Sequence, residues 1–187
     1  MQYYYVHDLD EISNITAKQL SKTLERDVTV LHWEKYKDFR NNLYLMINEL
    51  KKEKDDIILI GSGLGAYYAN ALANALQVPC ALFNPVINPK ETLNKLKADS
   101  KIHSFNDSIL YMLIHTYHTP KDTVIPRVVV VGLEDTMTNP YESIKYWCDR
   151  CDLRVAINAG HKISNFGVFK KAILELENLF FIDLGEI

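Results

Sequence analysis

Three residues of this chain have the side-chain types and the order needed for serine-based acyl transfer. Ser62 carries a hydroxyl, Asp135 a carboxylate and His161 an imidazole. In such chemistry a histidine near its working pKa takes the proton of the hydroxyl, and the acid fixes the tautomer of that histidine. Asp135 and His161 each follow an apolar run, so we expect both at strand ends, in the order nucleophile, acid, base.

The turn that holds Ser62 reads Gly61-Ser62-Gly63-Leu64-Gly65 and joins an apolar run to a helical pattern. A nucleophile on such a turn needs small residues two positions before and two after it, because the turn is too tight for side chains there. Gly61 and Gly65 meet this requirement, so the nucleophile position is Gly63, which has no side chain to acylate. Ser62 is the candidate substitute nucleophile, but we expect it to point towards neighbouring structure.

The same turn also matches a dinucleotide-binding pattern, with Gly61, Gly63 and Ala66 in the G-x-G-x-x-G/A positions. Two features disfavour this interpretation. The turn follows the third expected strand rather than the first, and the next strand ends in Asn84-Pro85 instead of an acidic residue that would hold a ribose. We therefore favour a hydrolase turn over a phosphate site.

Strand and helix patterns alternate along the chain, which predicts a parallel sheet with helices on both faces. Continuous apolar runs such as "DDIILIG" and "PRVVVVG" are typical of strands buried on both sides. The expected strands are Tyr3–Val6, Val28–His32, 55–61, 78–85, 126–132 and 152–160, and the expected helices are Ile15–Glu25, Tyr36–Lys52, Gly65–Leu76, Pro89–Ala98, Pro140–Asp149 and Phe166–Leu179.

Composition places the chain among ordinary globular proteins, with 187 residues, 48% hydrophobic and 24% charged. We expect one domain over residues 1–187. The net charge of −3, without a cluster of basic residues, disfavours nucleic-acid binding.

No apolar stretch approaches the ~20 residues of a membrane span, and the N-terminus lacks a secretory pattern. Three cysteines, an odd number, favour a reducing compartment, so we expect a cytoplasmic protein without a membrane partner.

Four segments together resemble the small bacterial single-domain α/β-hydrolases typified by the esterase YqiA. These segments are "GSGLGAYYA" at 61–69, "ALFNP" at 81–85, "YVHD" at 5–8 and "NAGHKISNF" at 158–166. The resemblance implies a three-layer α/β-hydrolase fold and hydrolysis of small carboxylic ester or thioester substrates without a cofactor or metal. It also implies Asp135 as the acid, His161 as the base, and an oxyanion and substrate region formed by His7, Asp8, Leu9 and Leu64.

Two departures from that family bear on activity. Gly63 stands where the family has its serine, and His7-Asp8 stands where it has His-Gly. The oxyanion hole works through aimed backbone N–H groups, and a carboxylate beside it would repel the developing charge by about a few kcal/mol. The sequence therefore predicts impaired or absent catalysis. The alternative is a catalytically inactive hydrolase fold that serves as a small-molecule binding or interaction module.

The remaining signals are weaker. Residues 86–124 lengthen one strand connection and predict either a short lid or pocket wall, or a helix packed on the sheet. His115 and His118 have a metal-pair spacing but no third ligand nearby, and Cys148 and Cys151 form a Cys-x-x-Cys pair at an expected helix end. We interpret both pairs as structural. The sequence does not indicate an oligomeric state.

Overall fold

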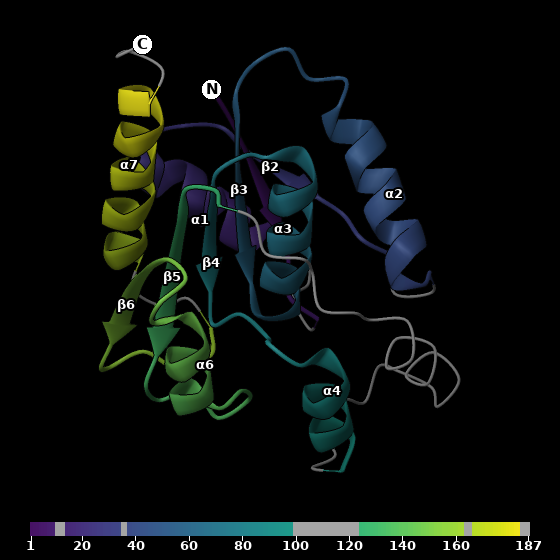
Figure 1. The fold of residues 1–187 in the computed structure, drawn as a ribbon, viewed down its shortest axis with the longest axis vertical. Coiled ribbons are helices and arrows are strands. Elements are labelled where there is room, and N and C mark those ends of the chain that lie inside the picture. Colours follow the sequence, from purple (N-terminus) through teal and green to yellow (C-terminus); the bar gives the residue numbers. More distant parts are fainter. Residues whose placement is uncertain (10–13, 35–36, 99–123, 163–165, 184–187) are drawn as a thin grey trace.

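The computed structural model describes residues 1–9, 14–34, 37–98, 124–162 and 166–183 (Figure 1). His115, His118 and most of the predicted lid therefore lie outside the described residues. Of that segment, the described part includes α4, Pro89–Ala98, as expected from the sequence. No helix in the described part of the chain is long and apolar enough to cross a membrane.

The strands form one parallel sheet in the order β2-β1-β3-β4-β5-β6, which confirms the predicted parallel architecture. Apolar runs with many β-branched residues build its centre, and all side chains of β3, β4 and β5 are buried. The strands are β1 (Gln2–Val6), β2 (Val28–Leu31), β3 (Ile57–Ser62), β4 (Cys80–Phe83), β5 (Arg127–Gly132) and β6 (Asp152–Ala156).

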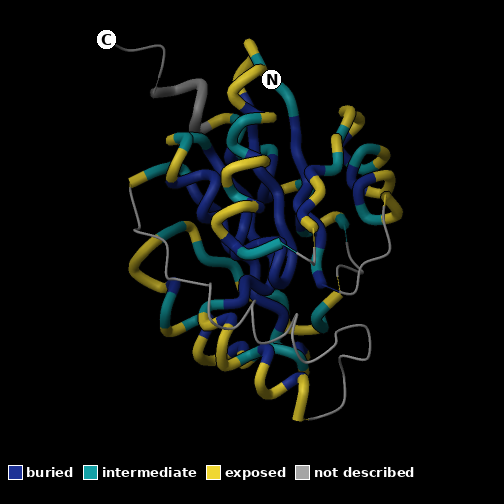
Figure 2. The backbone as a smooth tube through the Cα atoms, turned by 90° about the vertical axis from the view of Figure 1, so that its right-hand side faces the viewer, coloured by how far each residue is buried: buried dark blue, intermediate teal, exposed yellow. Residues whose placement is uncertain are grey.

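Helices cover both faces of the sheet, because successive strand residues point to opposite sides. Along β3, Ile58 and Ile60 face a core shared with α1 and α7, whereas Leu59 faces the core of α2 and α3. Figure 2 shows the buried strands at the centre of the molecule. The predicted three-layer architecture, with helices on both faces of the sheet, is thus confirmed. The helices are α1 (Ile15–Leu24), α2 (Phe39–Leu50), α3 (Gly63–Leu76), α4, α6 (Pro140–Trp147) and α7 (Phe166–Asp183).

Several boundaries near the site differ from the sequence prediction, and β3 ends at Ser62 rather than residue 61 and β4 at Phe83 rather than residue 85. The last strand ends at Ala156 rather than residue 160, because the chain turns back towards β5, where Glu134 N donates to Ala159 O at 3.0 Å. Helix α3 begins at Gly63, two residues earlier than predicted. These differences lie at the carboxyl ends of the strands, which face the lower part of Figure 1.

Candidate active site

The turn between β3 and α3 is as tight as the sequence predicts. Ser62 is the last residue of β3, and Gly63 opens α3 with φ +53°. A Cβ atom on Gly61 would lie under 3.0 Å from the backbone of Ala66, and one on Gly65 under 3.0 Å from the backbone of Val6 and His7 at the end of β1. Only glycine fits these two positions without moving the backbone.

Ser62 does not face His161. Its Oγ lies 2.5 Å from the phenol oxygen of Tyr5 on the neighbouring strand β1, and both groups are buried. This contact is on the face of the sheet opposite to Leu59 and Gly61, since strand residues alternate. The predicted inward direction of Ser62 therefore matches the geometry.

Asp135 and His161 lie together, as the strand-end argument predicts. His161 Nδ1 is 2.9 Å from Asp135 Oδ2. The acid is held by its own loop, because Met137 N and Thr138 N donate to Oδ1, and Thr138 Oγ1 donates to Oδ2 at 2.6 Å. The Asp135 side chain is fully buried, and that of His161 is 11% exposed. The ring is thus fixed in position and its Nε2 atom is directed away from Asp135.

His161 Nε2 contacts a second carboxylate, that of Asp8, at 2.7 Å from Oδ2. The other oxygen of Asp8, Oδ1, accepts hydrogen bonds from Leu64 N at 2.8 Å and Leu9 N at 2.7 Å. Leu64 is the residue after the nucleophile position, and Leu9 follows β1 by three residues. These two N–H groups are the ones that an oxyanion hole on this turn would use.

The repulsion that Asp8 would exert on negative charge developing at the oxyanion region stays a prediction. In the resting protein the carboxylate makes attractive contacts with Leu9 N, Leu64 N and His161. Two backbone N–H groups and the His161 ring surround the carboxylate, and hydrogen bonds of this kind stabilise the charged form. A pattern of residue types does not reveal this arrangement, because the three partners come from positions 9, 64 and 161.

Gly63 leaves the space that the Asp8 carboxylate fills. A Cβ atom on Gly63 would lie well under 3.0 Å from the Asp8 carboxyl group, closer than real Cβ atoms approach other atoms. The first atom of a side chain at the nucleophile position and the carboxylate of Asp8 therefore exclude one another as long as Asp8 keeps its contacts with Leu9, Leu64 and His161. The two departures from the hydrolase pattern belong to a single structural feature.

The opposite charges of His161 and its two neighbours, Asp8 and Asp135, determine which of these groups is protonated. Burial alone lowers the pKa of His161, but hydrogen bonds and charges from Asp135 and Asp8 outweigh it and raise that pKa to about 10. Burial alone raises the pKa of each carboxyl, yet the hydrogen bond and charge of His161 hold both pKa values below the usual range. At neutral pH the site is a protonated imidazole between two carboxylates, so His161 is no general base in this state.

Asn84 is a site residue to which the sequence assigned no role in the site. Its side chain donates to Gly160 O and His161 O, each at 2.9 Å, and its Oδ1 accepts from Gly132 N at 2.7 Å. Asn84 is buried and has φ 46°, a left-handed backbone that asparagine tolerates better than most residues. It ties the end of β4 to the end of β5 and to the loop that carries His161. An Asn-Pro pair at the end of a buried strand was the available signal.

His7 supports the loop rather than the reacting groups. Its ring stacks on Trp33 with 5.5 Å between centroids, and its Nδ1 lies 2.9 Å from Asp8 O. The Trp33 ring donates to His7 O at 3.0 Å. His7 therefore fixes the chain that presents Asp8. Cys148 and Cys151 follow α6, where their thiols donate to Lys145 O and Trp147 O, and the structural interpretation of the pair stays a prediction.

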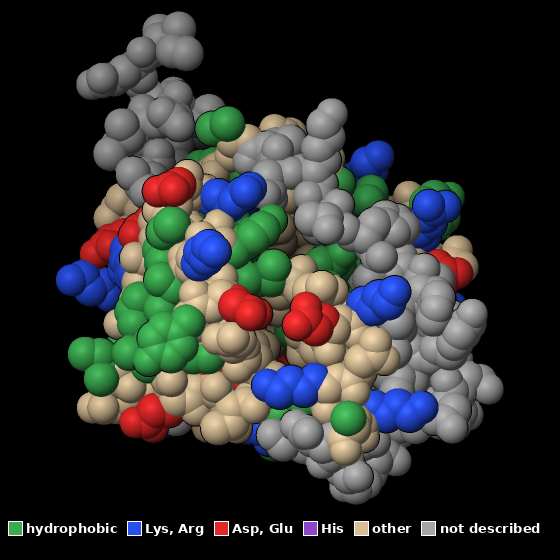
Figure 3. Space-filling view, turned by 60° about the horizontal axis from the view of Figure 1, so that its bottom comes forward, with side chains coloured by type: hydrophobic (Ala, Val, Ile, Leu, Met, Phe, Trp, Pro, Cys, Tyr) green, Lys and Arg blue, Asp and Glu red, His purple; other side chains and the backbone are tan. Residues whose placement is uncertain are grey.

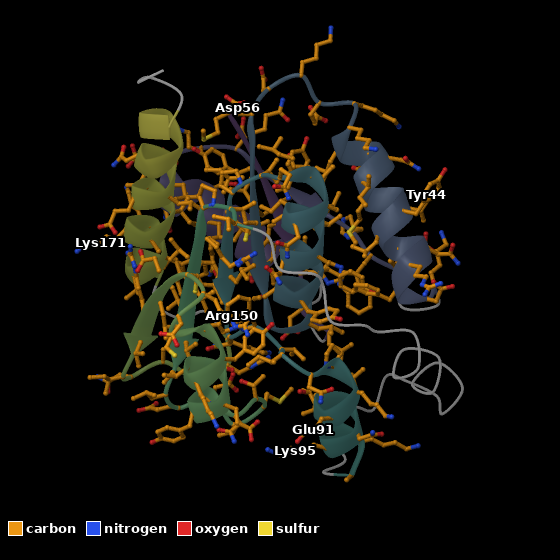
Figure 4. The ribbon with its side chains drawn as sticks, viewed as in Figure 1. Tyr44, Asp56, Glu91, Lys95, Arg150 and Lys171 are labelled. Carbon is orange, nitrogen blue, oxygen red and sulfur yellow. The ribbon has the colours of Figure 1, made fainter. Side chains whose placement is uncertain are left out.

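One small cavity adjoins the Asp8–His161 pair, and a larger groove lies next to that cavity. A cavity of about 20 Å³, enough for roughly one water molecule, adjoins both residues and is otherwise mainly apolar. A groove of about 890 Å³ lies between α4 and α6, and Thr92 and Met137 line both spaces. Figure 3 shows acidic and basic side chains mixed on this end of the molecule, and Figure 4 shows Glu91 and Lys95 extending from α4. The lining of the small cavity includes Leu9, Leu64, Val86, Leu93 and Leu96.

Comparison with solved structures supports the fold assignment. Est1E from Butyrivibrio proteoclasticus has 14% identity and a TM-score of 0.71, with 95% of this chain and 88% of that chain covered. Alpha/beta hydrolase domain-containing protein 10 from mouse has 13% identity and a TM-score of 0.71, covering 96% and 90%. The Pyrococcus furiosus esterase PF2001 has 15% identity and a TM-score of 0.68, covering 96% and 81%.

These identities are low enough that the likeness shows the fold alone. No curated protein sequence matches the chain at a significant level. A match over residues 3–177 spans the sheet, the Gly63 turn, Asp8, Asp135 and His161. By this match, the chain belongs to the uncharacterised protein family UPF0227.

Proposed function

We propose that this chain is an esterase-type α/β-hydrolase fold in which serine-based ester hydrolysis is impaired or lost, and that it binds a small acyl ester or a similar ligand. The observation that supports this most directly is the 2.7 Å contact between His161 Nε2 and Asp8. In a working triad this ring nitrogen takes the proton of the nucleophile. Here a carboxylate holds it instead.

The position of Ser62 supports the same conclusion. To attack a substrate, its hydroxyl would have to leave Tyr5 and reach the other side of the turn. Gly61 and Gly65 are in close contact with neighbouring backbone, which resists a shift of the turn by one residue. The general requirement that nucleophile and base lie within hydrogen-bond reach is therefore unmet for Ser62.

The oxyanion hole is also occupied. Enzymes that lose a triad serine generally retain ~10³–10⁴-fold acceleration over water through the oxyanion hole and substrate binding. Leu64 N and Leu9 N already donate to Asp8 Oδ1, so a substrate oxygen would have to displace a charged acceptor. We therefore expect ester hydrolysis below even this residual level.

Ligand binding is the part of hydrolase function that the site retains. The groove between α4 and α6 has the volume typical of small-molecule pockets. A solved complex of Est1E from Butyrivibrio proteoclasticus, of the same fold, contains ferulic acid. A small carboxylic ester is the ligand class we propose for this groove, whose lining includes Glu91, Lys95 and Arg150.

Two measurements test the proposal. Wild-type protein and Ser62→Ala are treated with a fluorophosphonate and analysed by intact mass, with an active serine esterase in the same tube as a reference. We expect labelling of the reference only, and a label on Ser62 that Ser62→Ala abolishes would refute the loss of serine chemistry. Titration with p-nitrophenyl butyrate should shift the amide signals of Thr92, Met137 and Thr138 in NMR spectra, and unchanged spectra would refute binding in the groove.

A further inference from the structure

We infer that this protein has a second ligand site, next to the loop that carries His161, and that this site binds a medium-chain alkyl carboxylate. The site is a cavity of about 300 Å³ between the end of β6, the residues that follow it and α7. None of its lining residues lines the groove or the small cavity beside Asp8. The inference goes beyond the proposed function and does not depend on it.

The wall of this cavity is mainly apolar. Val130 of β5 and Phe169 of α7 line it, and both side chains are buried. Ala156 of β6 and Val168 of α7 add further apolar surface, where β6 and α7 lie side by side (Figure 1). The volume is at the lower end of the range of small-molecule pockets. The cavity therefore suits a hydrocarbon chain of medium rather than great length.

Two large hydrophobic side chains of the lining are exposed to solvent. Ile157 is 71% exposed and Val155 is 44% exposed. Single exposed hydrophobic residues are common on protein surfaces and need no explanation. These two differ because they border an apolar cavity, so one bound chain would cover both and fill the space between them. Removal of that apolar surface from water favours binding.

The charge of the lining indicates the head group of the ligand. Among the described residues that line the cavity, Lys162 is the one with a charged side chain, and it is exposed. The exposed amide of Asn158 adds a hydrogen-bond donor. A carboxylate brings one negative charge to this one cation. A phosphate monoester carries up to about two negative charges at pH 7, so one of them would stay uncompensated.

The cavity adjoins the hydrogen bonds that hold the His161 loop. Asn84 and Gly160 both line it. The side chain of Asn84 donates to Gly160 O and to His161 O, each at 2.9 Å. A ligand in the cavity therefore contacts residues that keep His161 in place, and its binding should be visible in the NMR signals of this loop.

A second copy of the chain is the competing occupant of this surface. In the described part of the chain, β6 is the last strand of the sheet, and an open strand edge can pair with another chain. A twofold contact uses the same patch on both copies. It would therefore bring a second Lys162 to the patch instead of an anion. The charge of the lining favours the carboxylate.

The test is a titration of the ¹⁵N-labelled full chain with sodium octanoate at pH 7, below the concentration at which octanoate forms micelles. We expect saturable shifts of the amide signals of Ala159, Gly160 and Val168, and unchanged signals of Thr92 and Met137 in the groove. Butyrate should bind more weakly because its chain is shorter, and 1-octanol more weakly because it has no charge. Shifts confined to the groove, or no shifts, would overturn the inference.

Variants of the lining separate the head group from the chain. Lys162→Gln should raise the Kd of octanoate roughly three- to fivefold and leave that of 1-octanol unchanged. Lys170→Gln is the matched control, because it removes the same charge from α7 at a position outside the cavity lining. Equal effects of the two variants would show that only the net charge matters and would contradict a site at Lys162.

Two further variants test the place of the chain. Val168→Phe should fill much of the cavity and abolish binding, and far-UV circular dichroism checks its fold. Ile157→Ser changes an exposed position and should weaken binding with the fold intact. Full affinity in both variants would overturn the inference. A dimer that persists in octanoate, measured by analytical ultracentrifugation and broken by Ile157→Ser, would assign the surface to a second copy instead.

Discussion

Asp8 and the nucleophile position, Gly63, share one volume: the carboxylate of Asp8 stands where the first side-chain atom of residue 63 would have to lie. The carboxylate accepts a hydrogen bond from the backbone N–H of Leu64, the residue after Gly63. It also contacts His161, the histidine that would act as base for a nucleophile at position 63. This relationship explains both departures from the esterase pattern together. It also makes the energetic coupling between positions 8 and 63 measurable.

Gly63→Ala should destabilise the protein by roughly 2–5 kcal/mol. The added methyl group meets the Asp8 carboxylate, and alanine is strained at φ +53°. Asp8→Gly removes the clash, so the double variant should be more stable than the sum of the single effects predicts. Urea unfolding of the four proteins measures this coupling. Strict additivity would show that the two residues do not compete for space.

Stability should fall as the pH rises from about 6.5 to about 10. The pKa of His161 is raised in the folded state, so in this window the folded protein keeps a proton that the unfolded chain has lost. The stabilisation by His161 is complete below the pKa that this residue has in the unfolded chain. It is lost as the pH rises past the pKa of His161 in the folded protein. We expect a loss of a few kcal/mol, measured by urea unfolding at several pH values.

Asp8→Asn is the control for this pH dependence. It removes one of the two carboxylates that raise the pKa of His161, so the decline should be smaller and should end at a lower pH. Asp8 and Asp135 act in the opposite direction at acidic pH, because their pKa values are lowered on folding and their stabilisation is lost as the pH falls. An identical alkaline profile for Asp8→Asn would contradict the contact between Asp8 and His161.

Asn84→Ala should cost roughly 2–4 kcal/mol and loosen the loop that carries His161. The change removes three hydrogen bonds at a buried position and leaves Gly132 N without that acceptor. Asn158→Ala, at an exposed position of the same loop, is the matched control and should be nearly neutral. Urea unfolding gives the stabilities, and the NMR signals of the His161 ring report its position. Equal stability of the two variants would refute the tying role of Asn84.

The sequence was sufficient for the sheet and for the pairing of acid and base. Apolar runs bounded by turns locate the strands, and parallel strands bring their carboxyl ends to one edge, which places Asp135 beside His161. Glycine spacing alone predicts the tight turn at Gly63. These inferences depend on local patterns, which a single sequence carries.

Local sequence patterns could not predict the direction of the Asp8 side chain. It depends on the backbone of the loop after β1 and on partners 56 and 153 positions away. The role of Asn84 is similar, because its partners lie 48, 76 and 77 positions further along the chain. Contacts between distant loops require the assembled sheet before they can be recognised.

The most direct test restores the esterase residue types at both positions of the pair. In Asp8→Gly/Gly63→Ser, the new hydroxyl gains the space of the carboxylate, and His161 and the N–H groups of Leu64 and Leu9 become available to it. We predict fluorophosphonate labelling and p-nitrophenyl butyrate hydrolysis in the double variant, and neither in the wild type, Asp8→Gly or Gly63→Ser. Labelling of Gly63→Ser alone at the rate of the double variant would contradict the conclusion that Asp8 occupies the nucleophile's place.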